Sequence, residues 1–144
     1  MKNTGRKALG KSSNSSNDRL MQYSSDDRKT RTKLRTKVEA QREAGNRQDV
    51  ESVLQTIHPN SMIYGAARAQ LSHQFDKYRL KVESAGFHYI GQDEDYAYAR
   101  ATQETIKLAG PDFKDNVIEQ RYVFKRDTDT WKIWAAAPLS VRLL

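Results

Sequence analysis

The chain of 144 residues is 37% hydrophobic, carries 25 lysines and arginines against 18 aspartates and glutamates, and contains no cysteine. Its length suits a single domain with a core of its own. The lack of cysteine excludes disulfides, thiol nucleophiles and thiolate metal sites. Because no stretch of about eighteen apolar residues occurs, we expect no membrane span, no signal peptide and a cytoplasmic location.

The positive charge is concentrated near the N-terminus. Residues 1–37 contain eleven lysines and arginines and three aspartates, whereas the rest of the chain has 14 basic and 15 acidic residues. Residues 1–24 are also rich in serine and asparagine and poor in large apolar side chains, a composition that does not repay the entropy of ordering. The sequence therefore predicts a disordered basic tail over residues 1–24 and one domain over residues 25–144.

Three helices are predicted in the first half of this domain. The first begins at the serines and aspartates of residues 24–27 and ends before Gly45. The second follows the capping residue Asp49, has apolar residues at positions 50, 53, 54 and 57, and ends before Pro59. The third covers residues 66–78, and the apolar run 62–64 before it is interpreted as a short strand or a plug.

Alternation of apolar and polar residues predicts strands over residues 80–90 and 96–108, followed by a hairpin over residues 116–137. The polar turn at residues 127–129 joins the two strands of this hairpin. Residues 118, 120, 122 and 124 share one face of its first strand, and residues 131, 133, 135 and 137 are expected to share one face of its second. Helices followed by antiparallel strands predict an α+β fold whose sheet wraps over the helices.

Several segments resemble the nuclear transport factor 2-like superfamily, which includes the SnoaL-like and ketosteroid isomerase-like folds. They are AGNRQDVESVLQTIHPNS at residues 44–61, DEDYAYARATQET at 93–105 and DTDTWKIWAAAPLSV at 127–141. Residues 103–116 resemble a bacterial subgroup of uncharacterised members. The resemblance implies a cone-shaped α+β barrel, with three N-terminal helices in a strongly curved, mainly antiparallel sheet. It also implies a pocket at the open end and frequent dimers through the outer face of the sheet.

The superfamily contains isomerases and polyketide cyclases beside proteins without catalysis, so the resemblance implies no particular reaction. An isomerase or cyclase needs a carboxylate base and a hydroxyl or acid donor in a dry site. No residue set here matches a known catalytic set, so the catalytic residues stay unknown, and neither a metal nor a cofactor is expected. The candidates for lining a pocket are Tyr64, Asp76, Tyr78, Gln103, Gln120 and Tyr122.

Two further surfaces are predicted. Trp131 and Trp134 should point to opposite faces of their strand, which leaves an aromatic patch outside, and the dimer-interface candidates are Tyr98, Phe124 and Trp134. The basic run at residues 28–37 is the strongest charge signal in the chain. It is either a helix face exposed to solvent or a site that binds a polyanion such as nucleic acid. The candidate residues for binding a polyanion are Arg28, Lys29, Arg31, Lys33, Arg35 and Lys37.

We therefore expect a dimerising domain that binds a small apolar or amphipathic ligand without catalysis. The alternatives are a pocket enzyme of the isomerase or cyclase type and a basic-tailed adaptor for nucleic acid or a protein partner.

Overall fold

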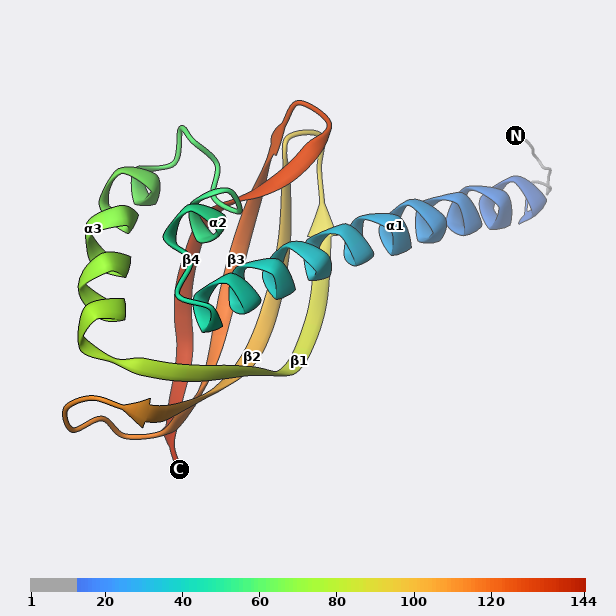
Figure 1. Ribbon diagram of the computed structural model, residues 1–144. Coiled ribbons are helices and arrows are strands. Elements are labelled where there is room, and N and C mark those ends of the chain that lie inside the picture. The colour runs from blue at the N-terminus through green and yellow to red at the C-terminus, as the bar shows by residue number, and fades with distance from the viewer. Residues whose placement is uncertain (1–12) are drawn as a thin grey trace. The chain divides into compact units, whose positions relative to one another are not determined.

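The computed structural model describes the backbone of residues 13–144 and the side chains of residues 25–144 (Figure 1). The chain divides into two units, of which the second is Lys33–Leu144, and the boundary lies inside helix α1, Ser13–Asn46. This helix starts upstream of residues 24–27, where the sequence predicted its start. The tail predicted for residues 1–24 stays a prediction, and its first twelve residues lie outside the described part of the chain. None of the described helices is long and apolar enough to cross a membrane.

The second unit contains two more helices, α2 (Val50–Leu54) and α3 (Met62–Lys77). Asp49 caps α2 as predicted, because its carboxylate accepts a hydrogen bond from the backbone N–H of Ser52 at 3.1 Å. Ser61 caps α3 in the same way, through the N–H of Ile63 at 3.2 Å. Residues 62–64 therefore form the first turn of α3, and their interpretation as a short strand or plug was wrong.

Four strands follow: β1 (Arg79–Gln92), β2 (Tyr96–Ala109), β3 (Asn116–Asp127) and β4 (Thr130–Leu143). Each pairs antiparallel with its neighbour in the chain, in the order β1-β2-β3-β4. Register shifts on either side of residues 85–90 interrupt β1, which bends sharply in Figure 1. The α+β class and the curved antiparallel sheet are confirmed, but the sheet stays open and does not close into a barrel.

The core lies between the second half of α1 and the inner face of the sheet. Leu34 and Val38 are buried on α1, four residues apart and therefore on one helix face. They belong to one cluster with three alanines of β2 and large side chains of β3 and β4: Ala97, Ala99, Ala101, Tyr122, Phe124, Trp131 and Ile133.

A bulge in β4 corrects the predicted faces of the last hairpin. Trp131 and Ile133 are buried in the core, and Ile133 pairs with Phe124. The register then shifts, so that Ala135 pairs with Val123 and Ala137 with Arg121, which lie on the outer face. Residues 135 and 137 thus lie opposite to residues 131 and 133, although the sequence predicted a shared face.

The outer edge of β4 is held by the segment after α2. Ile57 forms a parallel bridge with Ile133, in which His58 N–H donates to the Ile133 carbonyl at 2.9 Å and Ile133 N–H donates to the Thr56 carbonyl at 2.8 Å. Two more backbone carbonyls near this edge are bonded by side chains, since Ser61 Oγ donates to Trp134 O at 2.6 Å and His58 Nε2 lies 3.2 Å from Arg126 O. These bonds fix α2 and the start of α3 against the sheet.

Candidate functional site

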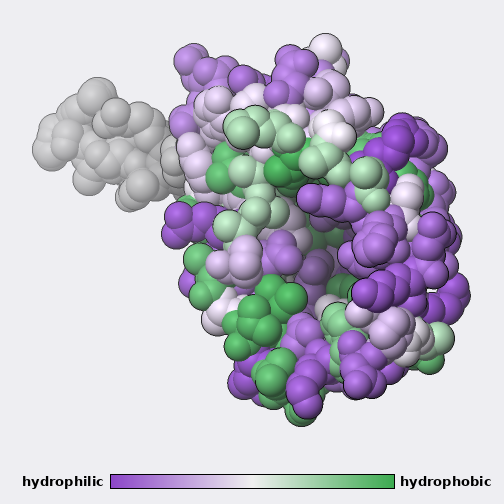
Figure 2. All heavy atoms as spheres, turned by 90° about the vertical axis from the view of Figure 1, so that its left-hand side faces the viewer, coloured by the Kyte–Doolittle hydropathy of each residue, from purple (hydrophilic) through white to green (hydrophobic). Residues whose placement is uncertain are grey.

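A cavity of about 310 Å³ lies between the end of α1, helix α3 and the inner face of the sheet. Figure 2, which faces the side of the molecule that carries α3, shows the surface hollowed between polar and apolar groups. The apolar wall of the cavity comes from α2, α3 and β1. Polar side chains of α1, α3, β2 and β3 line the rest of the cavity. The lining residues are Gln41, Arg42, Gly45, Asn46, Gln48, Val53, Leu71, Gln74, Phe75, Tyr78, Leu80, Val82, Gln103 and Gln120.

Part of this polar lining is structural. Gln48 has a positive φ of 57°, and its side-chain amide donates to the carbonyls of Phe75 at 3.2 Å and Tyr78 at 2.9 Å. Asn46 bonds both backbone groups of Val82, each at 2.9 Å. These bonds satisfy buried backbone groups and join the end of α1 to α3 and β1. Gln48 and Asn46 therefore shape the cavity and have little hydrogen-bonding capacity left for a ligand.

Four glutamine amides in the lining remain available. Within the described part of the chain, the side chains of Gln41, Gln74, Gln103 and Gln120 make no hydrogen bond. Gln103 pairs across the sheet with Ile118, and Gln120 follows two residues later on β3, so both amides lie on the inner face as diagonal neighbours. Each amide offers donors and an acceptor, so the site can bond both kinds of group on a ligand.

The lining of the cavity carries almost no charge. It contains no aspartate, glutamate, histidine or lysine. Its single arginine, Arg42, donates to Glu39 at 2.6 Å and to the Val82 carbonyl at 3.1 Å. General acid–base catalysis needs a titratable group within hydrogen-bond reach of the substrate, and among these lining residues only the Tyr78 hydroxyl remains. The geometry therefore favours binding by hydrogen bonds and apolar contact.

The predicted pocket residues separate into two groups. Tyr78, Gln103 and Gln120 line the cavity. Tyr122 lies in the core, where it stacks on Phe124 and where burial raises the pKa of its hydroxyl to about 12. Tyr64 packs beside the small cluster of Leu54, Ile57 and Ala67, and Asp76 is exposed on α3. In the described residues, no group of three histidine, aspartate or glutamate side chains is placed to hold a metal ion.

Residues 36–144 match a known protein family. The family described as "Anti-sigma-I factor RsgI9, C-terminal domain" matches residues 36–144, which include every residue of the cavity. The chain belongs to this family. The match begins within the second half of α1, so the family corresponds to the folded second unit and not to the basic residues before it. No curated protein matches the chain.

Solved structures share the fold of this family member at low sequence identity. A conjectured aromatic ring hydroxylase from Novosphingobium aromaticivorans has a TM-score of 0.67 and 15% identity, covering 79% of this chain and 92% of its own. Bd1075 of Bdellovibrio bacteriovorus has a TM-score of 0.64 and 20% identity, covering 76% of this chain and 41% of its own. An NTF-2 like protein of unknown function from Shewanella oneidensis has a TM-score of 0.59 and 13% identity, over 74% and 96% of the two chains. The nuclear transport factor 2-like fold is thereby confirmed.

The predicted dimer residues differ in accessibility. Tyr98 and Trp134 are half-buried on the outer face of the sheet. Loss of contact with water raises the pKa of the Tyr98 hydroxyl, and the negative charge of Asp93 raises it further. Trp134 meets His58 edge to face, with ring centroids 5.2 Å apart, and Lys125 Nζ lies 4.5 Å from the centre of its ring. Phe124 is fully buried, because alternation along β3 turns it toward α1, so its side chain offers no surface to a second copy.

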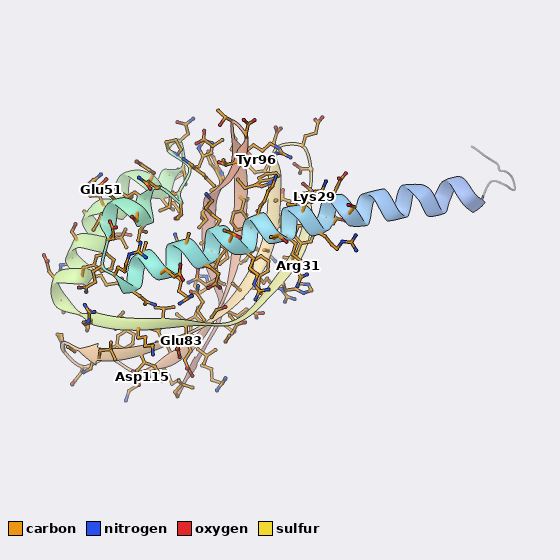
Figure 3. All side chains as sticks on the ribbon, turned by 45° about the vertical axis from the view of Figure 1, so that its right-hand side comes forward. Lys29, Arg31, Glu51, Glu83, Tyr96 and Asp115 are labelled. Carbon is orange, nitrogen blue, oxygen red and sulfur yellow. The ribbon has the colours of Figure 1, made fainter. Side chains whose placement is uncertain are left out.

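The six basic candidates all lie on α1. Arg28, Lys29 and Arg31 are exposed in the first unit, and Figure 3 labels Lys29 and Arg31. Lys33 and Arg35 are exposed in the second unit, whereas Lys37 is half-buried. The polyanion role of this run stays a prediction.

Several cavity residues were not predicted from the sequence. Gln41 and Gln74 lie three positions after Val38 and Leu71, at the border of the apolar stripes of α1 and α3. That spacing was the available signal, because a polar side chain at the border of a buried stripe can face a cavity. Neither Asn46 nor Gln48 was predicted to shape a cavity, since their hydrogen-bond partners lie far away in the chain.

Proposed function

We propose that the domain is a non-catalytic binding module whose cavity accepts a small, uncharged, amphipathic ligand. The observation that carries this proposal is the composition of the lining: four glutamine amides without hydrogen bonds in the described structure, beside an apolar wall and without a carboxylate, histidine or lysine. An apolar wall faced by polar groups that can fix the orientation of a ligand is a feature of small-molecule sites. The family description, an anti-sigma factor domain, suits recognition better than chemistry.

The lining limits the chemistry of the ligand. A charged ligand would leave water for a site without a free countercharge, because Arg42 is already paired with Glu39. A wholly apolar ligand would strip water from Gln103 and Gln120 without replacing their hydrogen bonds. A ligand with one amide-like group and one apolar body satisfies both walls.

Titration of the ¹⁵N-labelled chain with benzamide and related neutral amides tests this proposal. Gln103→Leu and Gln120→Leu should each weaken binding about tenfold, which corresponds to the loss of a hydrogen bond of about 1.4 kcal/mol. Gln70→Leu is the matched control, because Gln70 is exposed on α3 and does not line the cavity. Equal losses in all three variants, or shifts confined to residues outside the lining, would contradict the proposal.

A second function, dimerisation through the outer face of the sheet, is favoured by one aromatic cluster. Lys125 Nζ lies over the rings of both Trp134 and Tyr96, at 4.5 and 5.3 Å from their centres, and the two rings lie 6.5 Å apart. Aromatic side chains that are partly exposed in a folded chain are frequent at interfaces. Sedimentation equilibrium should give twice the mass of one chain, and Trp134→Ala should raise the dissociation constant. A single-chain mass at high concentration would end this hypothesis.

A further inference from the structure

A second concave site lies beside α1, and it shares no lining residue with the cavity. We name it the basic groove; its volume is about 450 Å³. It lies between α1, α2 and the beginning of β4, wholly within the second unit. The lining residues are Lys37, Ala40, Glu43, Arg47, Ser52, Gln55, Thr56 and Lys132. Three cations and one carboxylate line it, and Asp127 is paired with Lys132 from outside the lining, so one positive charge remains in excess.

Lys37 is a half-buried cation of this groove that has no partner among the described residues. No ion pair or hydrogen bond joins its ammonium group to another described residue. Burial lowers the pKa of Lys37, and the positive charge of Lys132 lowers it further. A partly buried cation beside a like charge is unfavourable unless an anion approaches it.

The carboxylates near the basic groove do not supply that anion. Glu43 is exposed, and its Oε2 lies 3.9 Å from Arg42 Nη2, on the other side of the helix. Asp127 lies 3.1 Å from Lys132, so it compensates Lys132 but not Lys37. Arg47 makes no ion pair within 4.0 Å among the described side chains, although Asp49 lies near enough to feel its charge.

We propose that the basic groove binds a phosphate group through Lys37, Arg47 and Lys132. Lys37 and Arg47 make no ion pair among the described side chains, so their charges favour an anion. Both lysines can approach its oxygens as point charges, while the arginine offers its planar donors. The hydroxyls of Ser52 and Thr56 already donate to Asp49 at 2.7 Å and to the Val53 carbonyl at 2.6 Å. Recognition of the phosphate therefore rests on the three cations. This second site goes beyond the amide-lined cavity and uses none of the cavity's residues.

The test uses the full ¹⁵N-labelled chain and two probes at constant ionic strength, inorganic phosphate and O-phosphoserine. Both should shift the amide signals around residues 37, 56 and 132. Tighter binding of phosphoserine indicates a phosphate carried on another molecule, and equal binding indicates the free ion; either result supports the site. Sodium chloride at the same ionic strength should leave these signals in place.

Lys37→Gln and Lys132→Gln should weaken phosphate binding about tenfold or more, as expected for hydrogen bonds to charged groups. Lys33→Gln is the matched control, because Lys33 is exposed one turn earlier on α1 and does not line the groove. Without phosphate, Lys37→Gln should also raise the melting temperature, since it removes the repulsion from Lys132. Shifts that chloride reproduces, or an equal loss in Lys33→Gln, would overturn the proposal. Benzamide binding in the cavity is measured in the same samples, so failure of one site is distinguished from failure of the other.

Discussion

Replacing Gly110 by alanine should destabilise the fold at the base of the cavity. Gly110 has a φ of 121°, which an L side chain rarely adopts, and a Cβ added there would lie 2.6 Å from the carbonyl oxygen of Lys77 and 2.9 Å from Cδ1 of Tyr78. The backbone conformation costs about 1–3 kcal/mol in a residue other than glycine. Overpacking against a backbone atom adds a similar amount. We therefore expect Gly110→Ala to lower the free energy of unfolding by about 3 kcal/mol.

Urea unfolding followed by circular dichroism measures this loss. Gly65→Ala is the control, because Gly65 lies inside α3 and a Cβ there meets nothing within 4 Å. In a helix this exchange should stabilise the protein by about 0.5–1 kcal/mol. If Gly110→Ala cost less than about 1 kcal/mol, the steric reasoning would be refuted. Because Tyr78 lines the cavity and the ring of Phe113 lies 5.7 Å from its own, benzamide binding should weaken as well.

Three further changes test other parts of the structure. Gln48→Ala leaves the carbonyls of Phe75 and Tyr78 without their donor and should cost about 1–3 kcal/mol in urea unfolding, whereas a neutral result would mean that water replaces the amide. The raised pKa of Tyr122, about 12, means that its stabilising contribution is complete below pH 10 and is lost between pH 10 and about 12. In Tyr122→Phe, the free energy of unfolding should therefore fall less steeply between pH 10 and about 12 than in the unchanged protein. An equally steep fall in both proteins would contradict this reasoning. Leu34→Ala removes a fully buried side chain, so a loss of about 2–5 kcal/mol is expected, and retention of the melting temperature would argue against the packing of α1 on the sheet.

Local patterns in the sequence were enough to predict the fold class. The Asp49 cap and the apolar spacing after it predicted α2, and alternation predicted β1 to β3 within two residues of their observed ends. The last strand was predicted to end at residue 137, but β4 continues to Leu143. The bulge in β4 escaped prediction because residues 135–137 are all alanine, and identical residues show no contrast between two faces. The start of α3 was missed because Met62, which is exposed, was counted with its apolar neighbours.

The site was less predictable than the fold. Alternation placed Gln120 and Tyr122 on one face of β3, but it does not say where along the strand α1 crosses. Leu34 and Val38 cover Tyr122, so Tyr122 became part of the core, while Gln120 lies beyond them and faces the cavity. The basic run shows the same limit, since only Lys37 faces a second element, and its neighbour Lys132 is far away in the chain.

The bridge between Ile57 and Ile133 has a consequence for the order of folding. Every strand pairs with its neighbour in the chain, so the sheet can grow by consecutive hairpins that close short loops. The bridge joins distant segments, and closing a long loop costs more entropy. The short β3–β4 hairpin can therefore order Ile133 before Thr56 and His58 bond to it. We therefore expect α2 and α3 to dock last and to detach first, which opens the cavity while the hairpins stay intact.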